Sequence, residues 1–223
     1  MSGEITAKIT NNRVLKLFCD HGALLKNGHF CLTSGRHSSA YVNPDPILSE
    51  PEVLSELGFA MAQWIRDAKF IMPDTIVGPE TGGAYLAQWT AWHLRSFASG
   101  NIHAVGLHKK GKKSFTISPA LEQHVRGKRI FIVDDVLTSG RSIGLAADLC
   151  HKIGGEVLGA GCLLKRGEPR APELGFYKPF FILSLAVFML PDWRKKDCPL
   201  CKDGVPENTQ YGHGAMRTQK NSR

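Results

Sequence analysis

The sequence predicts an α/β protein with a mainly parallel, twisted sheet flanked by helices. Short apolar segments alternate with helix-like segments from about residue 75 onward. This alternation is typical of parallel strands whose connecting helices cover both faces of the sheet. The chain has 223 residues, of which 43% are hydrophobic and 22% charged. These values allow one large domain with a sizeable core.

The first part of the chain predicts a helix and then a hairpin. Apolar residues recur at helical spacing from Val14 to Phe18, and Gly22 is a stop signal. The segment GHFCLTSGRHSSAYVN, residues 28–43, then alternates apolar and polar residues around a Ser-Gly break. Such a pattern indicates two antiparallel strands.

A second helix is predicted to open at the segment SEPE. Ser49 is expected to cap it, Pro51 suits its first turn, and Glu52 completes an S-x-x-E capping box. Its buried face is expected to consist of Leu54, Leu57, Met61 and Ile65.

The remaining elements follow in alternation along the chain. We expect strands at residues 75–78, 102–108, 129–133, 156–164 and 180–190, with helices at residues 82–94 and 142–155. The run from Phe180 to Leu190 is too short to span a bilayer, so it is interpreted as a buried strand. The residues after Trp193 are polar and are predicted to form an appended arm. No apolar signal segment occurs at the amino terminus, and we expect a cytoplasmic protein.

The formal net charge of +8 is distributed unevenly. It gathers at residues 108–113, 125–129 and 192–196 and in the last residues of the chain. A basic surplus favours anionic partners, which are either nucleic acids or phosphorylated small molecules. A solvated, solubilising surface is the alternative.

Among six cysteines, only Cys198 and Cys201 form a motif, a C-x-x-C pair with zinc-binding spacing. A structural zinc site needs four ligands, and the sequence has no second C-x-x-C. His213 is the nearest candidate for a third ligand, and a dimer sharing ligands stays open. Zinc at Cys198 and Cys201 is therefore one hypothesis, and a tail with free thiols is the other.

Two adjacent acids follow the strand in RIFIVDDVLTSGRS, residues 129–142. Ligands of open α/β sheets bind at the carboxyl ends of strands, where Asp134 and Asp135 are expected to lie. Their carboxylates can accept hydrogen bonds from sugar hydroxyls or help to hold a metal-bound ligand. Residues Thr138–Ser142 then open a helix, whose N–H groups, hydroxyls and dipole favour a phosphate. The structural alternative is a capping aspartate followed by a polar turn.

The segment FIVDDVLTSGRS resembles the phosphoribosyl pyrophosphate signature of type I phosphoribosyltransferases. The resemblance implies that Asp134 and Asp135 contact the ribose hydroxyls. It also implies a 5′-phosphate loop made of Thr138, Ser139, Gly140, Arg141 and Ser142. The segment VGPETGGAYLA resembles the pyrophosphate loop of the same family. That loop would consist of Thr81, Gly82 and Gly83.

Two further segments resemble the orotate phosphoribosyltransferase branch of this family. Residues 28–45 resemble its amino-terminal hood, and Arg166 falls where that branch keeps an arginine for the carboxylate of the base. A bidentate guanidinium–carboxylate pair is the physical reason for such an arginine. The resemblance implies a base pocket shaped by Phe30, Ser34, Gly35, Arg36, Tyr41 and Arg166. It covers roughly residues 14–190. We therefore expect a phosphoribosyltransferase domain at residues 1–190, with a hood at about 14–45 and a core at about 50–190, followed by a carboxy-terminal arm at 191–223.

A lysine cluster lies directly before the signature strand, and its members are Lys109, Lys110, Lys112 and Lys113. Pyrophosphate gains negative charge as it leaves, so cations that approach it stabilise the transition state more than the ground state. A closing loop would also exclude water. The resemblance implies that this loop serves the neighbouring subunit of a homodimer. A solvated basic loop is the alternative interpretation.

Some residues depart from the family pattern. Ser114, Phe115 and Thr116 replace the residues that usually follow the loop lysines, and Lys165 replaces an acid before Arg166. Thr33 stands where some relatives carry a base-contacting lysine. These departures concern the base and the loop, and they leave the phosphoribosyl signature intact.

The leading hypothesis is magnesium-dependent transfer of phosphoribose from its pyrophosphate to orotate, in pyrimidine biosynthesis. Mg²⁺ would be held mainly by substrate oxygens and waters. One alternative is a phosphoribosyltransferase for another nucleobase. Another is a regulator that senses phosphoribosyl pyrophosphate and binds nucleic acid, although the hood, Arg166 and the lysines favour catalysis on small molecules. We expect neither a membrane nor a nucleic acid as partner of the enzyme.

Overall fold

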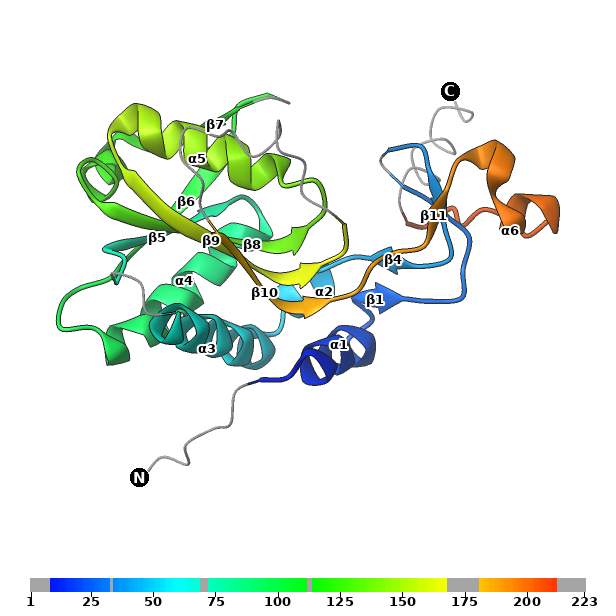
Figure 1. Ribbon diagram of the computed structural model, residues 1–223, viewed down its shortest axis with the longest axis horizontal. Helices are drawn as coiled ribbons and strands as arrows, with labels where there is room; N and C mark the ends of the chain where they lie inside the picture. Colours follow the sequence, from blue (N-terminus) through cyan, green and yellow to red (C-terminus); the bar gives the residue numbers. More distant parts are fainter. Residues whose placement is uncertain (1–8, 33, 69–71, 112–113, 168–180, 212–223) are drawn as a thin grey trace.

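The computed structural model describes residues 9–32, 34–68, 72–111, 114–167 and 181–211. A helix-covered sheet forms the larger part of the molecule (Figure 1). A smaller group of short strands lies at one end of it and includes residues from both the beginning and the end of the chain.

The larger part contains a six-stranded sheet in the order β10-β9-β8-β5-β6-β7. Its strands are β5 (Thr75–Pro79), β6 (His103–Lys109), β7 (Phe115–Thr116), β8 (Arg129–Leu137), β9 (Glu156–Lys165) and β10 (Phe181–Val187). All neighbours are parallel except β6 and β7. The chain runs from β5 to β6 on one side and from β8 to β9 on the other. The strand order therefore reverses between β5 and β8, the position where open α/β sheets bind ligands.

Helices cover both faces of this sheet. The described helices are α1 (Asn11–Asp20), α2 (Asp45–Leu48), α3 (Pro51–Asp67), α4 (Gly82–Leu94), α5 (Arg141–Ile153) and α6 (Pro199–Lys202), of which α6 lies in the carboxy-terminal arm, away from the sheet. Short 3₁₀ turns lie at η1 (Arg95–Phe97), η2 (Pro119–His124) and η4 (Lys195–Asp197). Helices α3 and α4 lie on one face of the sheet, and α5 covers the other (Figure 1).

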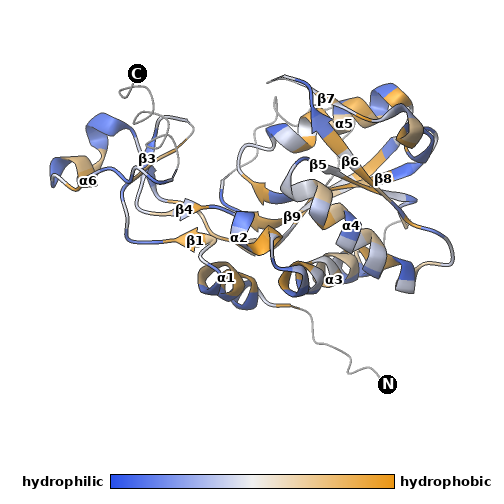
Figure 2. Ribbon diagram, turned by 180° about the vertical axis from the view of Figure 1, so that it is seen from behind, coloured by the Kyte–Doolittle hydropathy of each residue, from blue (hydrophilic) through white to orange (hydrophobic). Residues whose placement is uncertain are grey.

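Strand β8 is buried on both sides, because side chains alternate along a strand. Phe131 and Val133 join the apolar cluster of α3 and α4, whereas Ile130 and Ile132 join the cluster of α5. Figure 2 shows the resulting hydrophobic colour along β8. A strand held in this way fixes the position of the acids that follow Val133.

The smaller part is built from the hood and from the described residues 191–211 of the carboxy-terminal arm. Strand β1 (Leu24–Leu25) pairs with β4 (Tyr41–Val42), and β2 (Phe30–Cys31) pairs with β3 (His37–Ser38). The predicted hairpin is thus present. The arm adds β11 (Asp192–Trp193) to the edge of β3 in antiparallel orientation.

The predicted elements are present, with changes at some boundaries. The helix that begins the hood ends before Gly22, whose φ is +69°. Strand β8 extends to Leu137, because Val136 and Leu137 continue the ladder with β9. The acids therefore lie within the strand and not after it.

The expected capping box at Ser49 is wrong. Helix α3 begins at Pro51 with Glu50 in the cap position and without a side-chain cap. Ser49 instead ends the short helix α2, and its Oγ donates to the carbonyl of Pro46 at 2.9 Å. The expected buried face of α3 is confirmed at Leu54, Leu57, Met61 and Ile65. No helix in the described part of the chain is long and apolar enough to cross a bilayer.

Candidate active site

The acid pair lies at the reversal of strand order, near the end of β8. Asp134 is only 8% exposed, and Asp135 is half-buried. Backbone N–H groups hold both carboxylates, since Asp135 N donates to Asp134 Oδ1 at 3.0 Å and Val136 N donates to Asp135 Oδ1 at 2.6 Å. Burial and the neighbouring Asp135 raise the pKa of Asp134 well above its ordinary value, and burial raises the pKa of Asp135. Two buried acids of this kind favour a ligand that donates hydrogen bonds or brings a cation.

The glycines after β5 lie against these acids. A Cβ on Gly82 would overlap the carboxylate of Asp135, and a Cβ on Gly83 would come within 3.2 Å of Asp134 Oδ1. Glycine is therefore required at both positions by close approach. Thr81, Gly82 and Gly83 thus form a loop directly beside the acid pair.

Residues after the acids enclose a cavity of about 90 Å³ at the start of α5. Its walls include Asp134 and the whole segment Thr138–Ser142. Gly140 precedes the helix with a φ of +86°, a value that favours glycine. The 13-residue helix α5 directs its first N–H groups and its positive dipole end at this cavity. A phosphate is the ligand that such a site suits best.

A second cavity, of about 290 Å³, lies between the sheet and the hood. Ser34 and Arg36 line it from the hood, and Arg166, the first residue after β9, lines it from the sheet. Thr138 and Ser139 line both this cavity and the smaller cavity at the start of α5, which we call the phosphate cavity, so the two cavities are adjacent. Arg166 Nε donates to Thr138 Oγ1 at 2.9 Å. Burial lowers the pKa of Arg166, which remains a cation at neutral pH.

Lys109 and Lys110, the two described lysines of the cluster, lie at the tip of the β6–β7 hairpin. Lys109 and Lys110 are exposed, and Gly111 has the φ of +68° that a tight turn needs. Glu80, which precedes the glycine loop, accepts the backbone N–H of Lys109 at 2.5 Å. This bond ties the end of β6, next to the turn of the hairpin, to the loop that lies against the acids. Lys112 and Lys113 are outside the described residues.

Residues 45–186, more than half of the chain, match the family described as phosphoribosyl transferase domain. The chain belongs to this family. The expected family and fold class are thereby confirmed.

Curated relatives agree with this assignment. The orotate phosphoribosyltransferase of Heliobacterium modesticaldum is 32% identical over 199 residues, which cover 89% of this chain and 96% of the relative. That of Caldanaerobacter subterraneus subsp. tengcongensis is 29% identical over 197 residues, covering 87% of this chain and 93% of the relative.

Solved structures show the same fold. The orotate phosphoribosyltransferase of Aeropyrum pernix superposes with a TM-score of 0.61 at 23% identity, covering 78% of this chain and 93% of that one. The Mycobacterium tuberculosis H37Rv orotate phosphoribosyltransferase in complex with Fe(III) dicitrate superposes with a TM-score of 0.60 at 20% identity, covering 80% of this chain and 96% of that one.

In this phosphoribosyltransferase, the six predicted base-site residues lie in three places. Ser34, Arg36 and Arg166 line the larger cavity. Phe30 and Tyr41 stack on each other with ring centroids 5.7 Å apart, inside the hood. Gly35 forms the hairpin turn with a φ of +77°.

Sequence reasoning did not identify two acids of the phosphoribosyltransferase. Asp192 from the arm holds Arg36 through two side-chain contacts of 2.8 Å and also lines the larger cavity. Glu80 anchors Lys109, as described above. Asp192 is 156 residues from its partner, so no local pattern could reveal it. Glu80 stands next to the glycine loop, and that position was the only signal for it.

Proposed function

We propose that this phosphoribosyltransferase transfers phosphoribose from phosphoribosyl pyrophosphate to orotate, releasing pyrophosphate and forming orotidine 5′-phosphate. The observation that carries the proposal is the close packing of Gly82 and Gly83 against the carboxylates of Asp134 and Asp135. One ligand that reaches both the acids and the phosphate cavity at α5 would also touch this glycine loop. Phosphoribosyl pyrophosphate has a matching group for each of the three parts.

The donor would bind with its ribose hydroxyls donating to Asp134 and Asp135. Its 5′-phosphate would accept N–H groups and hydroxyls from residues 138–142, which line the cavity at α5. The pyrophosphate would lie over Thr81, Gly82 and Gly83. A Cβ would collide with Asp135 at Gly82, and with Pro79 and the carbonyl of Val133 at Gly83. Binding at both ends orients the anomeric carbon between them.

The acceptor would occupy the larger cavity, which adjoins the phosphate cavity at Thr138 and Ser139. Arg166 would pair with the carboxylate of orotate, a charge that uracil and the purine bases lack. Nε of Arg166 is already oriented by Thr138, so less side-chain entropy is lost on binding. The names of the curated relatives support orotate as the acceptor.

The reaction forms a bond from a ring nitrogen of orotate to the anomeric carbon and breaks the bond from that carbon to pyrophosphate. The proton of that ring nitrogen is released to pyrophosphate or solvent. The leaving group takes the bonding electron pair and accumulates negative charge. Lys109 and Lys110, together with Lys112 and Lys113, would stabilise that charge. The bond between Glu80 and Lys109 supports this role, because it places the start of the lysine segment at the pyrophosphate loop.

Mg²⁺ fits the donor set of this site. Burial disfavours the charge on both Asp134 and Asp135, so a nearby dication would stabilise their ionised forms. The ion would be held mainly by pyrophosphate and ribose oxygens and by waters, with these acids beside it. When bound, it would neutralise charge on the pyrophosphate.

A homodimer is the proposed assembly. Helix α4 exposes two large side chains seven residues apart on one face, Tyr85 at 53% and Trp92 at 60%. Burial of this face against a second copy would remove both from water. The molar mass measured by light scattering after size-exclusion chromatography tests this assembly. A monomer at micromolar concentration would contradict it.

A cytoplasmic location is also proposed. All six cysteines are free in the structure, as is usual in a reducing compartment.

The test of function offers the purified protein Mg²⁺, phosphoribosyl pyrophosphate and a panel of free bases, with products identified by mass. Orotidine 5′-phosphate is the expected product. A nucleotide of another base would keep the transferase and change the acceptor, whereas no nucleotide would refute catalysis. Tight RNA or DNA binding that weakens steeply with salt would then favour the regulator.

A further inference from the structure

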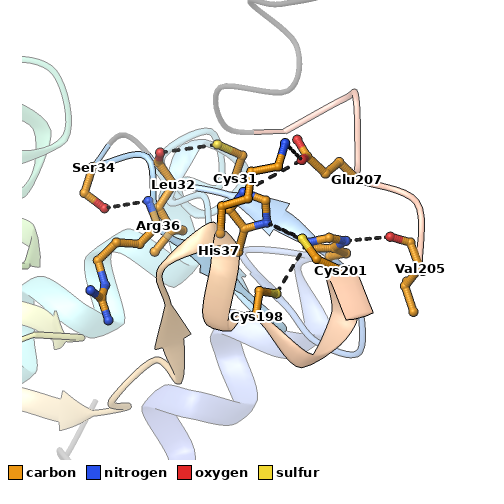
Figure 3. A network of polar contacts seen from close by, with 11 residues as sticks. Cys31, Leu32, Ser34, Arg36, His37, Cys198, Cys201, Val205 and Glu207 are labelled. Atoms are coloured by element: carbon orange, nitrogen blue, oxygen red, sulfur yellow. Dashed lines mark hydrogen bonds and ion pairs between the residues drawn. The ribbon is translucent and has the colours of Figure 1, made fainter. Parts of the chain in front are cut away.

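Four side chains with metal-binding atoms meet between the hood and the arm (Figure 3). We call this group the His/Cys cluster, and its members are His29, His37, Cys198 and Cys201. Their ligand atoms all lie within 4.8 Å of one another. His29 is 3% exposed, His37 1% and Cys198 0%, whereas Cys201 is half-buried. The cluster is distinct from the proposed active site.

A backbone carbonyl sets the tautomer of the neutral His29 ring. Its Nδ1 lies 2.7 Å from the carbonyl oxygen of Val205, which can only accept a hydrogen bond. Nδ1 therefore carries the proton of the neutral ring, and Nε2 presents its lone pair to the cluster. A second ring nitrogen, His37 Nδ1, lies 2.7 Å from His29 Nε2.

His37 is oriented in a similar way. Its other ring nitrogen, Nε2, faces the carboxylate of Glu207 at 3.7 Å. Metal-binding histidines usually direct their second nitrogen at a carbonyl or carboxylate, which fixes the ring and raises the basicity of the ligand. Both histidines of the cluster have such an oxygen behind them, Val205 O and Glu207 Oε1.

The remaining distances agree with a tetrahedral ion. Cys201 Sγ lies 3.6 Å from His29 Nε2 and 3.3 Å from His37 Nδ1, and Cys198 Sγ lies 3.7 Å from His29 Nε2. Tetrahedral zinc with its usual bond lengths places N and S ligands about 3.6 Å apart and two N ligands about 3.3 Å apart. Binding would require the two imidazoles to separate by roughly half an ångström.

We propose that the His/Cys cluster is a structural zinc site that joins the arm to the hood. Two thiolates and two imidazoles are typical ligands of structural zinc, and Cys198 and Cys201 provide the C-x-x-C spacing. The sequence identified this pair but sought its partners at His213, which lies outside the described residues. The two histidines come instead from β3 and from the residue before β2.

The local structure explains why a metal ion would be needed. Helix α6 has only four residues, too few for a helix to be stable by itself. The described part of the arm is joined to the hood by β11, by the bond from Asn208 N to His29 O of 2.7 Å, and by the bond from Ser38 Oγ to Pro191 O of 2.6 Å. A zinc ion would add a cross-link between segments more than 160 residues apart. The free energy of metal binding would then stabilise this end of the fold.

Another set of ligands shares His37 with the cluster. Cys31, His37 and Glu207 also lie close enough to contact one ion. That set contains one thiol and a carboxylate, and Lys195 also approaches the carboxylate at 3.4 Å. Zinc in a structural site favours the set with two thiolates.

The test begins with the metal content of wild-type protein, measured by mass spectrometry after purification without added metal. We expect about one zinc ion per chain, lost on unfolding in the presence of a chelator. Cys201→Ser and His29→Ala should lower zinc content at least tenfold. The matched control is Cys19→Ser, which removes an exposed cysteine on α1 and should retain the metal.

A second measurement does not depend on the folding of any variant. Metal-free wild-type protein titrated with Co²⁺ should develop the visible bands of a tetrahedral site together with thiolate-to-metal charge transfer. Cys31→Ser distinguishes the two sets, since it should leave both the bands and the zinc content unchanged.

Four results would overturn the proposal. They are wild-type protein without zinc that gives no Co²⁺ spectrum, zinc retained in Cys201→Ser, iron in place of zinc, and a Cys198–Cys201 disulfide in protein kept under reducing conditions.

Discussion

The two ends of the proposed active site are assembled in different ways. The donor end is assembled from two short segments, residues 81–83 and 134–142, which lie at the carboxyl ends of the adjacent strands β5 and β8. The acceptor end combines Arg36 of the hood, Arg166 of the core and Asp192 of the arm. The donor end thus depends on the sheet alone, whereas the acceptor end depends on how three separate segments are held together. The two ends should therefore respond differently to mutation.

The largest effect is expected from Asp134→Asn combined with Asp135→Asn. Both side chains keep an oxygen that can accept the N–H groups of Asp135 and Val136, so the fold should persist. Loss of the charges beside the ribose should lower kcat by about 100-fold or more. Steady-state rates of nucleotide formation measure this, with Asp20→Asn on the exposed face of α1 as the control. Near-normal turnover would remove these acids from the donor end.

Arg166→Ala is expected to act on the acceptor end. Removal of a charge-assisted hydrogen-bond partner costs about 1.5–3 kcal/mol, so KM for orotate should rise roughly 10- to 150-fold. The affinity for phosphoribosyl pyrophosphate should change much less. Arg166→Lys, which keeps the charge without the planar fork, should lie between wild type and Ala. An unchanged KM for orotate would indicate an acceptor without a carboxylate.

Removal of the proposed zinc ion should separate the two ends of the site. Arg36 lies next to the proposed zinc ligand His37, and its ion-pair partner Asp192 lies on β11, which pairs with β3. Loosening of the arm should therefore disturb the larger cavity, where we propose that orotate binds. We expect a several-fold rise in KM for orotate and a lower melting temperature, with unchanged calorimetric affinity for phosphoribosyl pyrophosphate. Equal weakening of the binding of both substrates would show that the two ends of the site are not independent.

The acid pair should also affect stability without ligand. Burial raises the pKa of both acids above the ordinary 3.8, so the folded chain binds their protons more tightly than the unfolded chain does. Their stabilising contribution is thus complete below about pH 3.8 and is lost as the pH rises through the folded values. At pH 8 the double Asn variant should melt a few degrees above wild type, and the difference should close as the pH falls towards 4. A lower melting temperature at pH 8 would contradict this.

The smallest effect on catalysis is expected from Asp74→Asn, at the opposite end of the sheet. Asp74 accepts three hydrogen bonds from Arg129, of 2.6, 2.9 and 2.9 Å, which lower its pKa to about 2. Because the folded pKa is depressed, this stability is present above pH 3.8 and is lost as the pH falls towards 2. Asn should lower the free energy of unfolding at pH 7 by about 1 kcal/mol and leave kcat unchanged. Urea titrations at pH 7 and pH 3 measure the free energy of unfolding of both proteins. An equal loss of stability at the two pH values would refute the proposed dependence on the charge of Asp74.

The difference between parts built from contiguous residues and parts built from distant segments also explains which features the sequence could predict. The elements of the sheet depend on contiguous residues, so local pattern was sufficient for them. The acid pair and the two loops proposed to bind phosphate are also contiguous in sequence, and their roles stay predictions. The cap at Ser49 was mispredicted because a short helix, α2, precedes α3 and uses that residue at its own end. Asp192 and the histidines of the His/Cys cluster meet partners more than 150 residues away. Such contacts are set by the packing of the arm on the hood, which one sequence does not reveal.

The most direct test of the account is calorimetric titration of phosphoribosyl pyrophosphate with Mg²⁺ into wild-type protein and into the double Asn variant. We predict saturable heat and a raised melting temperature for wild type, and loss of most of the affinity for the variant. Absence of heat and of thermal protection in wild type at millimolar ligand would contradict the claim that the acids and the two loops bind a phosphorylated sugar.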